Sequence, residues 1–147
     1  MRAKCVNAMK HARAEEAESW GRIKRTELTG KGMNKRQLGT EYENVAAEYL
    51  QSQGYEILER NFRCRSGEID LIAREGEYLC FVEVKYRAGS TCGSPLDAVG
   101  SHKQRQILKV AKYYLMKNDM TMDTPCRFDV VAVEGKKITL LRNAFGE

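Results

Sequence analysis

Three strand-like runs follow one another between two helical patterns, and this order limits the possible folds more than any other feature of the chain. The runs span Tyr55–Cys64, Glu68–Arg74 and Tyr78–Arg87. Gly67 and residues 75–77 supply turn signals between them. Strands joined by such short turns pair as antiparallel neighbours, and the apolar faces of the resulting sheet need helices to cover them.

The helical patterns flank these runs on both sides. From Lys35 to Gln53, apolar residues recur at spacings of three and four, and Gly54 stands where a helix commonly stops. After a Gly- and Ser-rich loop, Ser94 and Pro95 read as the start of a second helix that continues to about residue 117.

Two more strand-like runs, Arg127–Val133 and Lys137–Leu141, follow the second helix. The complete order is helix, three strands, helix, two strands. It predicts an α/β fold with a mixed β-sheet flanked by helices.

Residues 1–32 differ from the rest of the chain. They hold eight of the 25 Lys and Arg residues but only four of the 20 Asp and Glu residues, and they are poor in large apolar side chains. This composition predicts a basic, poorly ordered extension, with the folded domain spanning residues 33–147.

The composition also narrows the protein's class and location. No apolar run approaches the roughly 20 residues that a membrane helix needs. The five cysteines are odd in number and form no C-x-x-C pair, which argues against a disulfide framework or a structural zinc site. We therefore expect a cytoplasmic protein.

The third strand-like run carries two charges in unusual surroundings. Glu83 and Lys85 alternate with Val82 and Val84, so both charged side chains point to one face of a strand that is otherwise apolar. A central strand rarely carries opposite charges on a buried face unless they have a use. The alternative is a buried structural ion pair.

Asp70, on the preceding strand, completes a candidate site. A turn centred on residues 75 and 76 would place Asp70 opposite Phe81, with Asp70 and Glu83 as diagonal neighbours on one face. Two such carboxylates, with the carbonyl of Val84 as a further oxygen, suit Mg²⁺ or Mn²⁺ and not zinc. Lys85 would then assist an attacking water or balance charge during phosphodiester hydrolysis.

Glu43 is a fourth candidate, on the flank of the first helix's apolar stripe, where it could reach toward Asp70. Its alternative role is that of a solvated helix charge.

Basic residues around these strands and on the second helix are candidates for contacts with nucleic acid. They are Arg63, Arg65, Arg87, Lys103 and Arg105. Lys103 falls on the apolar stripe of its helix and should point toward the sheet. Arg105 falls opposite the stripe, where a solvated surface is the favoured interpretation.

These motifs resemble those of the YraN-like family of small bacterial proteins. The matching pieces include Gly39-x-x-x-Glu43, Gly67-Glu68-Ile69-Asp70-Leu71-Ile72 and Phe81-Val82-Glu83-Val84-Lys85. Two positions depart from the pattern. Ile69 precedes Asp70 at a position where the PD-(D/E)XK nuclease superfamily often has Pro. Tyr42 stands where many relatives have Gly, and we expect this change to alter how the first helix begins.

The family is similar to PD-(D/E)XK nucleases and to archaeal Holliday-junction resolvases. The resemblance implies a restriction-endonuclease-like αβββαβ core, with Asp70, Glu83 and Lys85 in the catalytic positions and Glu43 as the first-helix acid. It implies a DNA substrate, with branched or recombination intermediates as one class. Paired cuts in a four-way junction would require a homodimer. A non-catalytic nucleic-acid-binding module and an RNA substrate remain as alternatives.

Overall fold

The computed structural model describes residues 14–17, 32, 34–87 and 99–146. Its elements are β1 (Ala14–Ala17), α1 (Lys35–Ser52), β2 (Glu56–Cys64), β3 (Gly67–Glu75), β4 (Tyr78–Arg87), α2 (Ser101–Lys117), β5 (Cys126–Glu134) and β6 (Lys137–Phe145). The α/β class and the order of elements from α1 onward are as predicted, and they are compatible with a restriction-endonuclease-like core.

The sheet has the strand order β1-β6-β5-β4-β3-β2. Only β4 and β5 pair in parallel, because α2 connects them as a crossover; the other neighbours are antiparallel. β4, which carries Glu83 and Lys85, therefore lies in the interior of the sheet, as its apolar pattern predicts.

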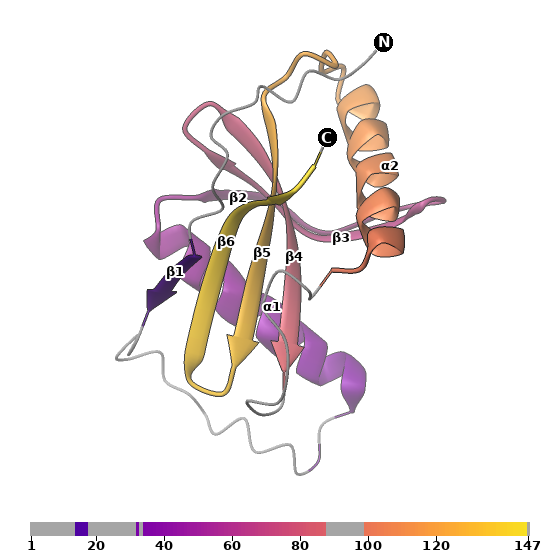
Figure 1. Ribbon diagram of the computed structural model, residues 1–147. Coiled ribbons are helices and arrows are strands. Elements are labelled where there is room, and N and C mark those ends of the chain that lie inside the picture. The colour runs from indigo at the N-terminus through magenta and orange to yellow at the C-terminus, as the bar shows by residue number, and fades with distance from the viewer. Residues whose placement is uncertain (1–13, 18–31, 33, 88–98, 147) are drawn as a thin grey trace.

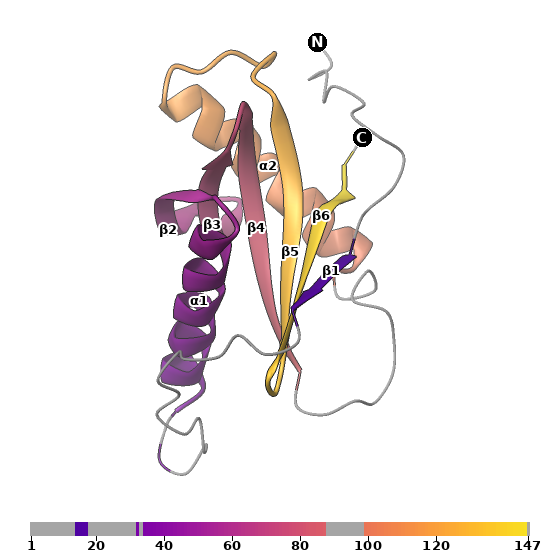
Figure 2. The same ribbon diagram turned by 90° about the vertical axis from the view of Figure 1, so that its left-hand side faces the viewer.

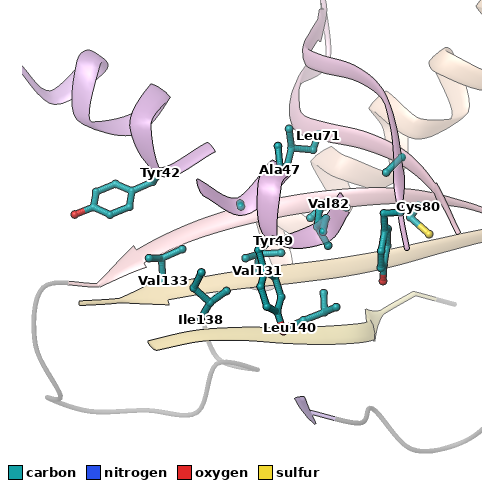
Figure 3. Close-up of a cluster of buried hydrophobic side chains, with 14 residues drawn as sticks. Tyr42, Ala47, Tyr49, Leu71, Cys80, Val82, Val131, Val133, Ile138 and Leu140 are labelled. Carbon is teal, nitrogen blue, oxygen red and sulfur yellow. The ribbon is translucent and has the colours of Figure 1, made fainter. Parts of the chain in front are cut away.

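Each helix covers its own hydrophobic cluster. The buried face of α1 packs with residues of β3, β4, β5 and β6, among them Leu71, Val82 and Val131 (Figure 3). A second cluster joins α2 to the other face through residues such as Ile72, Phe81 and Ile107. Figure 1 shows α1 crossing one face of the sheet diagonally, and Figure 2 shows it running beside the strands when the sheet is seen from the side. Residues 71–73 of β3 and 79–82 of β4 thus alternate between the two clusters, and on β4 this alternation fixes the face of Glu83.

Both helix boundaries have local causes. Asn34 caps α1 by accepting from the Gln37 backbone N–H, and the Gln37 side chain accepts from the Asn34 N–H in return. Gly54, with a positive φ of 92°, follows the end of α1 as predicted. α2 begins at Ser101 after Gly100, later than the predicted start; Ser94 and Pro95 themselves lie outside the described residues.

Within the basic N-terminal segment, Ala14–Ala17 pair with Ile138–Leu141 as the edge strand β1. Small and charged residues are tolerated there because an edge strand needs backbone hydrogen bonds on one side only. Apart from Gly32, the rest of residues 1–32 lies outside the described part of the chain, and for it the extension stays a prediction.

A buried polar network occupies the α1 face at the end of the sheet where β3 turns into β4. The fully buried Asp129 accepts hydrogen bonds from the Tyr55 hydroxyl, the Arg127 guanidinium and the Asn143 backbone N–H, each at 2.9 Å. Arg127 also pairs with Glu75, as does Arg142. The two guanidinium groups outweigh the effect of partial burial, so the pKa of the Glu75 carboxyl is lowered. These partners give Asp129 a structural role.

Candidate active site

The candidate site lies where β3 separates from β4. The β3–β4 ladder ends with Leu71 opposite Val82, whereas β2 and β3 stay paired as far as Cys64 and Gly67. The β2–β3 hairpin therefore leaves the sheet at Asp70 and extends toward α2 (Figure 1). At its tip, a Cβ on Gly67 would lie 2.6 Å from the Gln106 side chain, so the hairpin packs closely against α2.

The predicted register of the β3–β4 hairpin was wrong by two residues. Phe81 pairs with Ile72 and not with Asp70, because the turn is centred on residues 76 and 77, with Glu75 opposite Tyr78. A shift of two residues keeps every side chain on its face of the sheet. Phe81 belongs to the cluster under α2, and Glu83, two residues farther along β4, pairs with Lys103 of that helix. In β3 the alternation is interrupted at Asp70, because Ile69 and Ile72 both belong to the α2 cluster; the charges of Glu83 and Lys103 act on the pKa of Asp70, so the two acids are neighbours.

Asp70 is a largely buried carboxyl held by the neighbouring strand. Its Oδ2 accepts a hydrogen bond of 2.8 Å from the backbone N–H of Val84. Burial, and then the charge of Glu83, raise the pKa of Asp70 to about 7; the Val84 hydrogen bond and Lys103 act in the opposite direction. Near neutral pH this group therefore exchanges a proton readily, or gives it up to a cation.

Glu83 is buried, with 4% of its surface exposed, and its two oxygens have different surroundings. Oε1 lies 3.2 Å from the Lys85 Nζ and 3.7 Å from the Lys103 Nζ. Oε2 is buried and has no hydrogen-bond partner among the residues that the structure describes. An unpartnered buried carboxylate oxygen is costly in a folded protein, and a bound cation would satisfy it.

Lys103 points toward the sheet, as its position on the apolar stripe predicts. It comes from α2, so its ion pair with Glu83 ties the helix to the central strand. Together with Lys85 it places two ammonium groups beside the two acids.

Glu43 is half-buried and is held by a residue that the sequence prediction did not include. Its Oε2 accepts a hydrogen bond of 2.9 Å from the Asn61 side-chain amide. Asn61 falls opposite Asp70 in the β2–β3 register, and the charge of Glu43 contributes to the raised pKa of Asp70. Glu43 is therefore part of the site's electrostatics.

Asn61 has a left-handed backbone, with φ at 52°. Asn tolerates this conformation better than most residues, which makes an Asn inside a strand pattern a recognisable signal. Its local bend turns the amide toward α1.

Tyr42 does not alter the start of α1 as expected. The helix begins seven residues earlier, at Lys35, and continues through Tyr42 without a break. The Tyr42 ring is buried and stacks on Tyr86 with 3.8 Å between ring centroids. Because Tyr86 follows Lys85, this contact fixes the first turns of α1, and with them Glu43, against the end of β4.

The donor set fits a hard divalent cation only in part. Asp70 and Glu83 supply carboxylate oxygens on one face, one of them unpartnered. Within the described ranges, no group of three or more His, Cys, Asp and Glu side chains is arranged to hold a metal ion. Any remaining ligands would be backbone oxygens or water. The Val84 carbonyl, expected as one of them, stays a prediction.

The predicted nucleic-acid residues do not all gather at one place. Arg63, Arg65 and Lys103 line a hollow of about 380 Å³ at the tip of the β2–β3 hairpin. Arg87 lies 3.9 Å from Glu134 at the end of β4. Arg105 is exposed on α2 and lines neither of the two hollows beside the hairpin.

No helix in the described part of the chain has the length and apolar character needed to cross a bilayer.

Comparison with known proteins places these residues in a family. Residues 42–133 match the family described as "Uncharacterised protein family UPF0102", a range that contains Glu43, Asp70, Glu83 and Lys85. A UPF0102 protein of Lachnoclostridium phytofermentans is 54% identical over 113 residues, which cover 77% of this chain and 96% of that protein. A UPF0102 protein of Caldicellulosiruptor saccharolyticus is 45% identical over 119 residues, which cover 77% of this chain and 100% of that protein. The chain belongs to the UPF0102 family, the YraN-like family that its motifs resemble.

Proposed function

We propose that this protein is a cytoplasmic, metal-dependent endonuclease that acts on DNA with Mg²⁺ or Mn²⁺ as its cofactor. The observation that carries the proposal is the state of Glu83. One of its oxygens is shared by two lysines and the other is buried without a partner, next to a second carboxyl whose pKa is raised to about 7. Such an arrangement is costly for stability alone and is typical of a site that binds a cation.

Asp70 and Glu83 would hold the ion, with the Val84 carbonyl as a candidate further ligand. A divalent cation there would supply Lewis-acid activation of a phosphodiester. The Val84 N–H orients the Asp70 carboxylate through the 2.8 Å hydrogen bond, so this ligand keeps its direction without reorganisation.

Lys85 would assist hydrolysis directly. Its side chain is about one-third exposed and its ammonium lies 3.2 Å from the Glu83 carboxylate, so it reaches both Glu83 and the solvent side of the site. There it can orient an attacking water and balance the negative charge that develops on the phosphoryl oxygens. Glu43, held by Asn61, would accept a proton or a hydrogen bond from that water.

DNA is the proposed substrate because basic residues surround the two acids, and branched DNA is one candidate form. Cutting a four-way junction symmetrically would also require two copies of the chain. The second candidate is a nucleic-acid-binding module without turnover, and the lack of a ready three-ligand cluster among the described residues favours testing it.

A cleavage assay separates these functions. The full chain is incubated with labelled linear, flapped and four-way-junction DNA and with RNA, in Mg²⁺, Mn²⁺ or EDTA. Asp70→Asn and Lys85→Ala are run beside Glu41→Gln, a control on the exposed side of α1. Metal-dependent cuts lost in the first two variants and kept in the control support the enzyme. Binding that persists in EDTA without cuts in any condition supports the module.

A further inference from the structure

A second hollow, of about 480 Å³, lies beside the site and shares only Glu43 with the chemistry proposed above. Arg36, Gly39 and Thr40 of α1 line it, together with Asn61 and Arg63 of β2. Glu43 also lines it, so the hollow borders the candidate site.

Among the described residues, no contact requires a glycine at position 39. It lies inside α1 without a positive φ, and a Cβ added there would meet no atom within 4 Å. Glycine in a helix interior is less stable than alanine. A larger residue at this position would therefore make the fold more stable. The glycine instead leaves open space beside the helix backbone.

The lining of the hollow suits an anion on a polar, extended ligand. Arg36 and Arg63 are exposed and bring two guanidinium groups from different elements. Arg63 is 3.1 Å from Glu68, but both side chains are about half exposed or more, so a phosphate can replace that carboxylate at little cost. The Thr40 hydroxyl and the Asn61 amide add neutral polar groups.

The position of the hollow relates it to the two acids. Asn61 lies opposite Asp70 in the strand register and donates to Glu43, so one residue borders both the site and the hollow. A nucleic-acid strand whose phosphodiester lay at Asp70 and Glu83 would continue past Asn61 and over Gly39.

We propose that this hollow binds the sugar–phosphate backbone of the strand next to the bond that is cut, with Arg36 and Arg63 on the phosphate and the sugar close against Gly39. The proposal rests on the proposed function for its substrate class. It assigns Gly39 a role in binding, in which the missing side chain admits the ligand.

Binding of a fluorescein-labelled DNA oligonucleotide in EDTA, followed by anisotropy, tests the proposal without turnover. Arg36→Gln should weaken binding about tenfold and reduce the slope of log affinity against log salt by about one. Gly39→Leu should weaken binding by a similar factor, and Gly39→Ala by less. The controls are Lys35→Gln, with the same charge change, and Ser52→Leu, which adds an apolar side chain at the exposed end of α1; both should bind like the unaltered protein.

Thermal unfolding of Gly39→Ala gives a second readout of opposite sign. We expect a higher melting temperature together with weaker DNA binding, because the helix gains stability while the hollow fills. If Gly39 had only a structural role, Gly39→Ala would lower both the melting temperature and the affinity for DNA.

The outcomes distinguish this proposal from the nuclease itself. Unchanged binding by both Gly39→Leu and Arg36→Gln would overturn the proposal that the hollow binds DNA. Cleavage by the unaltered protein would then still support the nuclease. Weakened binding in these variants without cleavage in any metal supports the hollow and overturns the nuclease. A protein that neither binds nor cuts at low salt overturns both.

Discussion

The backbone N–H of Val84 donates a 2.8 Å hydrogen bond to Oδ2 of Asp70 at the point where β3 and β4 part. The Asp70 side chain thus accepts a hydrogen bond from the β4 backbone at a point where the backbone of β3 is no longer paired with it. The same hydrogen bond aims the carboxylate at the face that holds Glu83, and this relationship connects the architecture of the sheet to the candidate chemistry.

The raised pKa of Asp70 predicts that the metal-free protein loses stability as pH rises. The folded protein keeps the Asp70 proton up to about pH 7, whereas the ordinary pKa of an Asp carboxyl is 3.8. Between these two values the folded state holds more protons than the unfolded state, so stability is highest at the acidic end of this range, falls through it and levels off above it. Asp70→Asn should remove this loss and be about 1–3 kcal/mol more stable than the unaltered protein at pH 8.

Urea unfolding in EDTA at several pH values measures this difference. Glu41→Gln is the matched control, because it makes the same substitution of amide for acid at an exposed position of α1. Parallel stability curves for the unaltered protein and Asp70→Asn would show that Asp70 is not destabilised by its surroundings.

Two substitutions at Asn61 should separate its backbone role from its side-chain role. Asn61→Gly keeps the left-handed φ accessible but removes the amide that holds Glu43, whereas Asn61→Ala also strains the backbone. We expect Asn61→Ala to be about 1 kcal/mol less stable than Asn61→Gly. Both should lower the cleavage rate about tenfold. Full cleavage by Asn61→Gly would exclude Asn61 as the residue that positions Glu43.

Removing the Lys103 charge should alter the pH at which the site binds a cation. Lys103 lowers the pKa of Asp70, so Lys103→Gln should leave Asp70 protonated up to a higher pH. Well above pH 7, where Asp70 is ionised in both proteins, Mn²⁺ should bind more tightly to Lys103→Gln, because a positive charge beside the cation is gone; toward neutral pH the proton on Asp70 should reduce this gain. Arg105→Gln on the exposed side of the same helix is the control. A loss of affinity that is the same at every pH would contradict this explanation.

The buried network at Asp129 should matter far more for stability than an exposed ion pair. Asp129→Ala leaves Arg127 and the Tyr55 hydroxyl without their buried partner and should cost about 3–5 kcal/mol. Glu68→Ala, which removes the exposed partner of Arg63, should cost about 1 kcal/mol or less. Urea unfolding of the two variants compares them, and equal losses would argue against a structural role for Asp129.

The sequence predicted the elements of the fold well because their signals are local. The alternation in residues 78–87 identified an interior strand with Glu83 and Lys85 on one face, and the stripe of α2 correctly directed Lys103 toward the sheet. The prediction that Asp70 and Glu83 are neighbours did not depend on the exact register, because an error of two residues keeps side chains on the same side of a regular strand, and the charge of Glu83 acts on the pKa of Asp70.

Features that depend on where elements meet could not be predicted in this way. The point at which β3 leaves β4 depends on how the hairpin packs against α2, which no local pattern encodes. Asn61 was missed for a similar reason, since its contact with Glu43 joins residues from different elements. Tyr42 was misjudged because its stacking partner, Tyr86, lies at the far end of another strand.

Titration calorimetry with Mn²⁺ at about pH 8 tests the central claim most directly, using the full chain, Asp70→Asn, Glu83→Gln and the control Glu41→Gln. The account predicts one cation per chain in the unaltered protein and the control, with affinity at least about tenfold weaker in both site variants. Equal Mn²⁺ affinity in all four proteins, or no binding to any of them, would contradict it.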